Sequence, residues 1–510
     1  MSHPNQASAT TAASGTRPAR ETARDSGALD KVSPRTAIVA LFIRLHFYIG
    51  IFVGPFIFVA ALTGTLYVLT PQIENHLYSH QLFTESQGTP HSLAEQIRSA
   101  QAGLIHHQDA KLLAIRPAST AGETTRVMFA LPELGPSESR AVFVDPVSLE
   151  NRGSEIVYGT SGILPFRTWL DYLHRGLLLG DVGRNYSELA ASWLWVAALG
   201  GVVIWWSTRH MSSATRRRKL KNSQTTAAKT QRLRHWHATM GLSLILGLLF
   251  FSATGLTWSQ WAGSNISVAR TALGWQTPSV KTQLPTPMSN HDMIHSHDMA
   301  MDEHAEHAEH HEPMPMPMED IETYSPTLFD EVLTAARHAG IDASKIEIRP
   351  ATRPHRAWTV SEIDRSWPTQ VDAVSVNPDT LEIVDKTDFN TFPLAAKLTR
   401  WGVDAHMGVL FGLPNQLILA AFGLGLCAMI GWGYRMWWIR RPKTRHDVNP
   451  VNTLTAALLL IPAFHRILIA LITLLLAVSL PVMGISLLIF LLIDVVRWYM
   501  SQPRQAIAKN

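Results

Sequence analysis

Six long apolar segments constrain the fold of this chain more than any other feature. Each is close to the roughly 20 residues that an α-helix needs to cross a bilayer. Of the 510 residues only 16% are charged, which also favours a membrane protein. The predicted fold class is a mainly α membrane protein, a polytopic helical bundle of about six transmembrane helices. The apolar segments lie near residues 37–69, 187–207, 238–258, 414–438, 453–475 and 480–499.

The positions of Lys and Arg predict how these helices are oriented. Residues 208–235 contain nine Lys and Arg and no acidic residue, whereas residues 262–397 contain ten basic and twenty-one acidic residues. A second basic run, Arg-Arg-Pro-Lys-Thr-Arg, begins at Arg440. Because basic loops stay on the cytoplasmic side of a membrane, we expect both runs and both termini in the cytoplasm. The connections 70–186 and 259–413 then lie on the outer side.

Four histidines near the ends of these segments belong to an internal repeat. The stretch around His46 aligns with the stretch around His237 at an offset of 191. The segment His-Arg-Gly-Leu-Leu-Leu-Gly aligns with His-Met-Gly-Val-Leu-Phe-Gly at an offset of 232, which places His174 on His406. His235 falls opposite an arginine of the first copy and is interpreted as an interfacial residue. The chain therefore reads as a tandem repeat.

The regions outside the membrane repeat as well. Ala-Ile-Arg-Pro-Ala at residues 114–118 matches Glu-Ile-Arg-Pro-Ala at residues 347–351, and residues 142–150 match residues 374–382. Each copy reads as a helix followed by three short strands, broken at Asp-Pro or Asn-Pro turns. We therefore expect two small α+β modules on the outer side.

An insertion of about 41 residues distinguishes the second copy, because the offset rises from 191 to 232 before the second module. Residues 291–318 contain seven His and six Met. Imidazole suits Cu, Zn and Ni, and thioether sulfur favours Cu(I). The segment is therefore interpreted as a multi-site metal binder, with a biased tether that has no fixed site as the alternative. The candidate metal ligands are His291, His295, His297, His304, His307, His310, His311, Met314, Met316 and Met318.

Together these features resemble the PepSY-associated transmembrane family, whose members include iron-regulated membrane proteins and haem-containing ferric-siderophore reductases. The resemblance covers roughly residues 37–440. It rests on the early Arg-x-His, on the segments 174–184 and 404–414, and on the paired outer modules. It implies two PepSY-like periplasmic modules and a multi-pass protein of the bacterial inner (cytoplasmic) membrane. The last apolar hairpin and the His/Met insertion lie outside this pattern.

The expected organisation has ten consecutive parts. They are a disordered cytoplasmic tail (1–34), transmembrane helix 1 (35–70), PepSY-like module 1 (71–165), a pre-helix with transmembrane helix 2 (166–207), the basic cytoplasmic loop (208–235), transmembrane helix 3 (236–260), the His/Met-rich insertion (261–320), PepSY-like module 2 (321–392), a pre-helix with transmembrane helix 4 (393–440), and a transmembrane hairpin with a cytoplasmic C-terminus (441–510).

With this resemblance, the paired histidines become candidate haem ligands. Parallel copies are related by a pseudo-two-fold axis along the membrane normal, so His46 and His237 share a depth near the cytoplasm. His174 and His406 share another depth near the outer face. Two axial ligands lie about 2 Å from one metal ion, whereas a partner across the bilayer is on the order of 20 Å away. We expect two b-type haems, each bound by two neutral imidazoles.

The implied function is that of an inner-membrane di-haem b electron-transfer protein that reduces a periplasmic ferric siderophore or other oxidised metal species. The cytoplasmic loops are too short for a flavin or nicotinamide domain, so the electrons come from a cytoplasmic donor or from membrane quinol. No nucleic-acid partner is expected. Two other classes stay open, namely a non-redox metal-binding or metal-uptake protein and a PepSY-type protein that restrains a peptidase. Whether the chain is an enzyme depends on this choice.

Ionisable residues lie inside the last two apolar segments, namely His465 and Arg466 in the fifth and Asp494 in the sixth. Arg466 and Asp494 are costly in a membrane unless they are paired and face protein. We therefore expect an Arg466–Asp494 contact within the closing hairpin, with a structural role.

Overall fold

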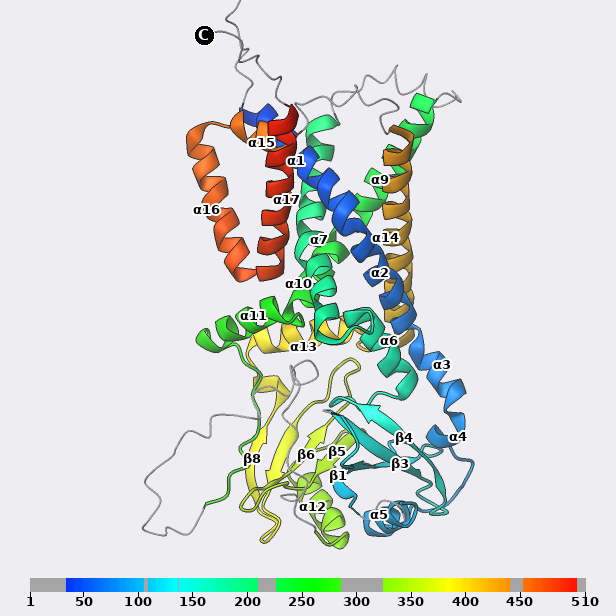
Figure 1. Cartoon of the computed structure of the whole chain (residues 1–510). Coiled ribbons are helices and arrows are strands. Elements are labelled where there is room, and N and C mark those ends of the chain that lie inside the picture. Colours follow the sequence, from blue (N-terminus) through cyan, green and yellow to red (C-terminus); the bar gives the residue numbers. More distant parts are fainter. Residues whose placement is uncertain are drawn as a thin grey trace, which may run out of the picture.

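A helical bundle stands on a domain built around a β-sheet in the computed structural model of the chain (Figure 1). The expected cytoplasmic tail before residue 34, most of the basic loop 208–235 and all ten candidate ligands of the His/Met insertion fall outside the described residues. The structure describes residues 34–104, 109–135, 137–209, 226–285, 324–440 and 453–501.

The bundle and the helices around it account for more than half of the described residues. They are α1 (Pro34–Tyr48), the π-helical turn η1 (Ile49–Val53), α2 (Gly54–Val68), α3 (Thr70–Leu77), α4 (Ser79–Leu82), α6 (Pro165–Gly176), α7 (Gly180–Thr208), α9 (Thr226–Ser243), α10 (Ile245–Thr257), α11 (Trp261–Ala272), α13 (Leu394–His406), α14 (Gly412–Arg440), α15 (Leu454–Leu459), α16 (Ala463–Ser479) and α17 (Pro481–Ser501).

The number of candidate membrane spans among the described residues is smaller than the six expected. Four helical segments are long and apolar enough to cross a membrane, and the bent pair α9–α10 makes a fifth if it is one span. The apolar segment 453–475 is divided at Pro462 into α15 and α16, because proline has no backbone N–H and its ring blocks the preceding turn. The four long segments are Arg35–Val68, Gly180–Thr208, Gly412–Arg440 and Pro481–Met500.

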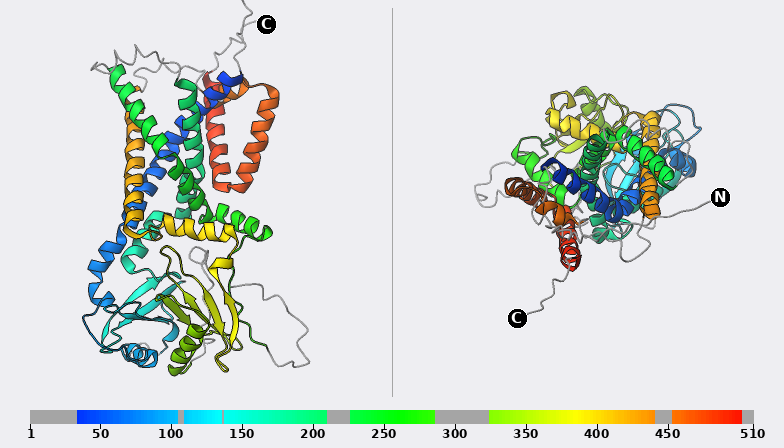
Figure 2. Two further views of the ribbon diagram at one scale, coloured as in Figure 1. Left: turned by 180° about the vertical axis from the view of Figure 1, so that it is seen from behind. Right: turned by 90° about the horizontal axis from the view of Figure 1, so that it is seen from above.

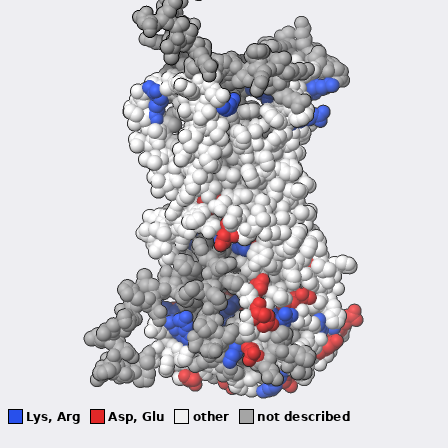
Figure 3. Space-filling model, viewed as in Figure 1, with Lys and Arg blue, Asp and Glu red and all other residues white. Residues whose placement is uncertain are grey.

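The surface agrees with a membrane location. Figure 3 shows a broad band without Lys, Arg, Asp or Glu over the bundle on this face of the molecule. Lys and Arg lie at the end of the bundle away from the sheet, and acidic residues gather toward the sheet. The band is what a helical bundle needs to remain in lipid, where exposed charge is costly.

The first span and the α9–α10 pair, which carry His46 and His237, are irregular at matched positions. Pro55 has no N–H to donate to the carbonyl of Ile51, and the Tyr434 hydroxyl of α14 donates to that carbonyl instead, at 2.7 Å. Next to Pro55 the first span forms the π-turn η1, which ends at Val53. In the second copy, α9 and α10 meet at 61° around Leu244, 191 positions after Val53.

The two modules that were expected on the outer side form one continuous antiparallel sheet, in the order β4-β3-β2-β1-β5-β6-β7-β8. Each copy supplies four strands rather than the three expected, and β1 joins β5 through the pair Ile115–Ile348. These two residues occupy the same place in the aligned Ile-Arg-Pro-Ala segments. The strands are β1 (Lys111–Arg116), β2 (Thr125–Ala130), β3 (Glu138–Val144), β4 (Asn151–Tyr158), β5 (Ile346–Arg349), β6 (Trp358–Glu362), β7 (Ala373–Val376) and β8 (Ile383–Thr387).

One face of the sheet is covered by α5 (Leu93–Ala102) and α12 (Thr327–His338), at the end of the molecule away from the bundle (Figure 1). Apolar residues of both copies bury one shared core there, including Phe129, Phe329 and Trp358. Asp330 of α12 accepts hydrogen bonds from the first two backbone N–H groups of α5, at 2.7 and 3.0 Å, which stabilises the positive end of that helix. The two halves therefore pack as one unit.

Three short helices, α6, α11 and α13, lie between the bundle and the sheet (Figures 1 and 2). Glu188 of α7 is fully buried and accepts hydrogen bonds from the backbone N–H groups of Trp261 and Ala262, at 2.9 and 3.1 Å. This carboxylate fixes the start of α11. α6 and α13 are the short helices expected before the second and fourth spans, and each carries its histidine near the C-terminal end.

The closing hairpin is held by contacts that differ from the expected Arg466–Asp494 pair. Asp494 of α17 is 1% exposed and accepts hydrogen bonds from the Tyr48 hydroxyl at 2.7 Å and from the backbone N–H and hydroxyl of Thr455, at 2.7 and 2.8 Å. Arg466 is exposed on α16, in a helix that has no buried residue. The carboxylate therefore joins α17 to α15 and to the first span.

Candidate functional site

The first histidine pair, His46 and His237, is called the inner pair, and its two rings meet within the bundle. His46 of α1 and His237 of α9 have ring centroids 6.2 Å apart, with their planes at 87°. His235, two residues before His237, is exposed. The register predicted from the repeat, with His237 rather than His235 opposite His46, is therefore the one that the structure has.

Matching hydrogen bonds orient the two inner rings. His46 Nδ1 bonds the carbonyl oxygen of Ala197 at 3.0 Å, and His237 Nδ1 bonds that of Met429 at 2.9 Å. Ala197 and Met429 are 232 positions apart, which is the offset of the second repeat block. Because a carbonyl only accepts, Nδ1 carries the proton in both rings, and Nε2 holds the lone pair of a neutral imidazole.

Two glycines leave room beside the inner rings. A Cβ atom on Gly201 would lie 3.4 Å from His46 Cε1, and one on Gly433 would lie 3.6 Å from His237 Cε1. Gly201 and Gly433 are also 232 positions apart, and each precedes a Trp-Trp pair by four residues. Larger side chains at either position would press on the imidazole that the neighbouring carbonyl holds.

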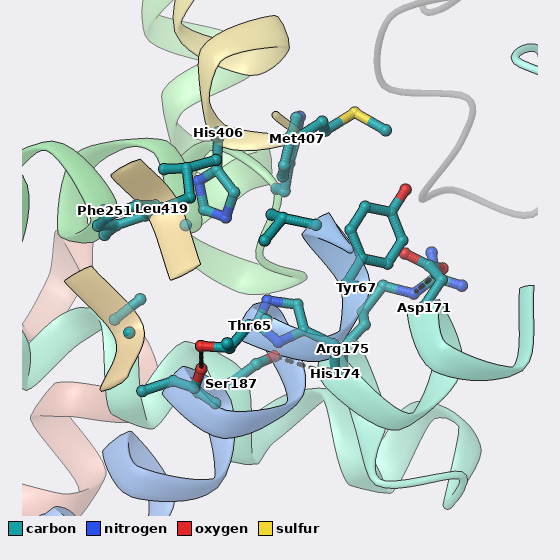
Figure 4. Close-up of a pocket in the computed structure, with 18 of the residues that line it drawn as sticks. Thr65, Tyr67, Asp171, His174, Arg175, Ser187, Phe251, His406, Met407 and Leu419 are labelled. Atoms are coloured by element: carbon teal, nitrogen blue, oxygen red, sulfur yellow. Dashed lines mark hydrogen bonds and ion pairs between the residues drawn. The ribbon is translucent and has the colours of Figure 1, made fainter. Parts of the chain in front are cut away.

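The second histidine pair, His174 and His406, is called the outer pair. It lies in a cavity between the bundle and the domain built around the sheet, which is called the outer domain. His174 of α6 and His406 of α13 both line it, and Figure 4 shows their rings on opposite sides of the opening. The cavity wall is mostly apolar and is built from α2, α7, α10 and α14. Phe251 and Trp258 contact His406, with ring centroids at 4.9 and 5.2 Å. An apolar cavity with a few converging polar groups is the usual form of a cofactor site.

Two threonines determine which ring nitrogen of each outer histidine carries the proton. Thr63 Oγ1 lies 2.9 Å from His174 Nδ1, and Thr254 Oγ1 lies 2.6 Å from His406 Nδ1. Each hydroxyl donates its one hydrogen to a backbone carbonyl four residues earlier in its own helix, at 2.8 Å for Thr63 and 2.9 Å for Thr254. Each oxygen is therefore an acceptor toward the ring, so Nδ1 again carries the proton and Nε2 the lone pair.

The outer rings, which lie outside the spanning helices, are held neutral. Burial lowers the pKa of His174 to about 4. Burial, together with the nearby His174, lowers the pKa of His406 to about 3. Both imidazoles are consequently uncharged at neutral pH, which is the form that binds a metal ion.

Residues that line the outer cavity pair by the repeat offsets. Gly64 and Gly255 are 191 positions apart, and Ala191 and Gly423 are 232 positions apart, as are His174 and His406. The second copy nevertheless supplies bulkier side chains, since Phe251 stands at the position that corresponds to Ala60. The residues that line the cavity therefore pair by position along the repeat but differ in size.

The sequence identified the four histidines but missed much of what surrounds them. Thr63-Gly64 and Thr254-Gly255 align at the offset of 191, yet nothing in this pattern indicates that the threonines contact histidines from other helices. Three glycines that recur beside the histidines in the repeat pack against protein and leave no room for a cofactor. Gly241 faces Met429, Gly176 faces Arg184, and Gly408 faces Gln416.

Among the residues that the structure describes, no group of three or more His, Cys, Asp and Glu is placed to hold a metal ion. Each histidine pair supplies only two ligands, so the absence of such a group does not test whether a pair binds a metal ion. The copper, zinc or nickel ligands proposed at 291–318 lie outside the described residues.

No curated protein shows significant similarity to the chain. The family described as the PepSY-associated TM region matches residues 43–440. This range contains the four histidines, all strands of the sheet and the residues that line the cavity. The chain therefore belongs to the PepSY-associated TM region family.

Proposed function

We propose that the chain is a duplicated inner-membrane protein that holds two b-type haems and passes electrons outward to an oxidised metal species, such as a ferric siderophore. The observation that carries this proposal is the set of four imidazoles whose Nδ1 atoms are all occupied by acceptors of matching geometry. A histidine that binds a metal through one nitrogen characteristically donates its other N–H to such an acceptor.

The inner pair fits a single metal ion. Two imidazoles that bind one ion from opposite sides, each through a nitrogen about 2 Å away, have ring centres about 6 Å apart. The centroids of His46 and His237 are 6.2 Å apart. Among the described residues the donors are two neutral nitrogens with no third protein ligand, a set that would suit haem iron, because the macrocycle would supply the other ligands.

The outer pair also suits haem, because of the shape of the cavity around it. His174 and His406 face one apolar cavity, and the small residues Ala60, Gly64 and Gly255 widen its wall. A flat macrocycle needs such a slot, with backbone close to both faces. When bound, haem supplies reversible one-electron chemistry at iron. The protein's own part is to orient the imidazoles, keep them neutral and exclude water.

The two pairs lie at different depths of the bundle. His46 and Thr63, the partner of His174, are 17 residues apart along one helical segment, or roughly 25 Å at 1.5 Å per residue. That is close to the thickness of the hydrocarbon core. Two redox centres placed in this way would connect a donor at the cytoplasmic face, a protein or a quinol, with an acceptor outside.

The experiment is a reduced-minus-oxidised absorption spectrum of the full chain in membranes and after purification in detergent. We expect a b-type spectrum that loses one haem in His46→Ala or His237→Ala and the other in His174→Ala or His406→Ala. His235→Ala is the matched control, since it removes an exposed imidazole of the same helix. A wild-type protein that purifies folded and without any haem spectrum would overturn the proposal.

A second candidate function is metal capture without redox chemistry, favoured by the seven histidines and six methionines of residues 291–318. Deleting this segment from the full chain separates the two candidates. Loss of copper binding with an unchanged b-type spectrum would show two independent activities. Loss of metal uptake in a chain that has no haem spectrum would leave metal capture as the function.

A further inference from the structure

We infer that α11 is an interfacial helix, whose exposed side lies at the boundary between phospholipid headgroups and acyl chains on the sheet side of the membrane. This side, together with the turn that follows the helix, is called the α11 face. Its large apolar residues are Trp261, Val268, Leu273 and Trp275, which are all exposed. The inference rests on the membrane family of the chain and on the geometry of α11, and it does not depend on haem.

The exposed positions of α11 follow one side of the helix. Trp261, Asn265, Val268 and Ala272 are exposed, and their spacing of four, three and four residues places them on one face. Val268 is 71% exposed and Trp261 is 50% exposed. The neighbouring Ala262 is fully buried in the core of the bundle. The helix therefore packs against protein on one side and leaves a mainly apolar face uncovered on the other.

The α11 face carries almost no charge. Residues 261–275 contain one charged side chain, Arg270, which is half-buried and whose Nη2 donates to the carbonyl oxygen of Trp275 at 3.3 Å. The indole N–H of Trp261 donates to Asn185 Oδ1 at 3.2 Å, so the exposed part of this ring is apolar. Exposed tryptophan and aliphatic side chains with few charges are typical of a membrane interface.

The last span begins at the level of α11. Figure 1 shows α11 next to the turn between α16 and α17. Asn265 Nδ2 donates to the carbonyl oxygens of Val478 and Ser479 in this turn region, at 3.3 and 3.1 Å. α16 has no buried residue, and α17 begins at Pro481 as one of the four long apolar segments. The α11 face therefore lies at the end of a hairpin whose apolar side chains point outward.

The length and direction of α11 favour a position on the membrane surface over one across it. Its 12 residues extend about 18 Å at 1.5 Å per residue, which is shorter than the roughly 30 Å hydrocarbon core. Figures 1 and 2 show that α11 runs across the end of the bundle, whereas the long helices run along it. A helix of this kind buries its apolar face about 5–10 Å into the boundary between headgroups and acyl chains.

This depth brings the outer cavity to the boundary between lipid and water. Trp258 and Ser259 line the cavity and lie just before the first residue of α11. Ser259 Oγ accepts a hydrogen bond from the backbone N–H of Gly263 at 3.2 Å, and Trp258 contacts His406. Lipid at the α11 face therefore holds a helix that continues directly from one wall of the cavity.

Spin labelling of the full chain in phospholipid vesicles tests this inference. Cys427 is the only cysteine, so Cys427→Ser gives a background without thiols, in which Val268→Cys carries a nitroxide. Collisions with oxygen, which concentrates in hydrocarbon, and with a nickel chelate, which stays in water, measure the depth of the label. Leu471→Cys on α16 and Glu382→Cys beside β8 are the matched controls for lipid and for water, because both side chains are exposed.

We expect the label at residue 268 to lie about 5–10 Å below the headgroup boundary, with oxygen access above that at residue 382 and below that at residue 471. Leu273→Cys gives a second position and should behave in the same way. Chelate access equal to that at residue 382 would place the face in water. Access to neither reagent would show that protein, such as a second copy of the chain, covers it, and oxygen access equal to that at residue 471 would place α11 inside the hydrocarbon core. Each of these three results would overturn the inference, and none depends on whether the chain holds haem.

Discussion

Arg116 and Glu347 form a buried ion pair across the seam of the sheet, with Arg116 Nη2 2.6 Å from Glu347 Oε2. Arg116 ends β1 and Glu347 lies in β5, next to the Ile115–Ile348 pair that joins the two copies. The same guanidinium donates from Nη1 to the carbonyl of Ser161, in the loop that lines the cavity. One side chain thus links the two halves of the sheet to the candidate site.

Removal of the charge of Glu347 should destabilise the outer domain. Glu347→Gln leaves Arg116 buried without its carboxylate, a change that costs about 3 kcal/mol when a buried pair loses one partner. The thermal unfolding midpoint of the detergent-solubilised chain measures the effect. Glu382→Gln, which changes an exposed carboxylate after β7, is the matched control and should leave the midpoint unchanged.

The same carboxylate should give a defined pH dependence. Burial by itself would raise the pKa of Glu347, but Arg116 and Arg349 outweigh burial, so its pKa lies below the ordinary 4.5. A carboxylate with a depressed pKa in the folded state stabilises the fold above the unfolded-state pKa and loses this contribution as the pH falls. We expect the wild-type midpoint to fall below about pH 4.5 more steeply than that of Glu347→Gln. Parallel pH curves for the two proteins would contradict this.

The threonines beside the outer histidines should control cofactor affinity. Thr63→Val keeps the shape of the side chain but removes the acceptor of His174 Nδ1, so the ring loses the bond that fixes its tautomer. Loss of such a partner lowers metal affinity by roughly 10–100-fold. Haem titration of Thr63→Val and Thr254→Val measures this loss, and Thr63→Ser, which keeps the hydroxyl, should bind as the wild type does. Unchanged affinity in both valine variants would show that the tautomer does not depend on these hydroxyls.

Gly433 should be needed for the inner pair. A leucine there would extend toward His237, because a Cβ atom would already lie 3.6 Å from His237 Cε1. We expect Gly433→Leu to lose the inner haem and to keep the outer one, as judged from haem content per chain. Gly431→Leu is the matched control, since a Cβ atom at that position would meet nothing within 4 Å. Equal haem content in the two variants would contradict the assignment.

How far the sequence predicts this architecture depends on which feature carries the information. Apolar length and the histidine repeat predict the membrane class and the His46–His237 contact, because equivalent residues of parallel copies meet at their common axis. The joining of two modules through Ile115 and Ile348 could not be predicted, since the pairing of edge strands leaves no local pattern. The carbonyl of Ala197 is equally invisible, because any residue type supplies the same acceptor.

The contacts that hold the closing hairpin could not be predicted from the sequence either. Charge alone indicated Arg466 as the partner of Asp494, because a hydroxyl or a backbone N–H cannot be recognised in an apolar sequence as a partner for a buried carboxylate. The structure instead gives Asp494 the hydroxyls of Tyr48 and Thr455 and the N–H of Thr455, the second residue of α15.

Asp494→Ala should therefore loosen α15 and α17 from the first span without removing the inner haem. The change leaves the Tyr48 hydroxyl and the Thr455 N–H without their buried acceptor, which costs on the order of 1–3 kcal/mol for each unsatisfied group. His46, two residues before Tyr48, keeps its own bond to the carbonyl of Ala197, so the b-type spectrum should persist while the thermal midpoint falls. Arg466→Gln is the control and should leave both unchanged, because Arg466 is exposed on α16. If Arg466→Gln lowered the midpoint as much as Asp494→Ala, the two charges would be partners after all, and the hairpin would be held in the way that the sequence pattern predicted.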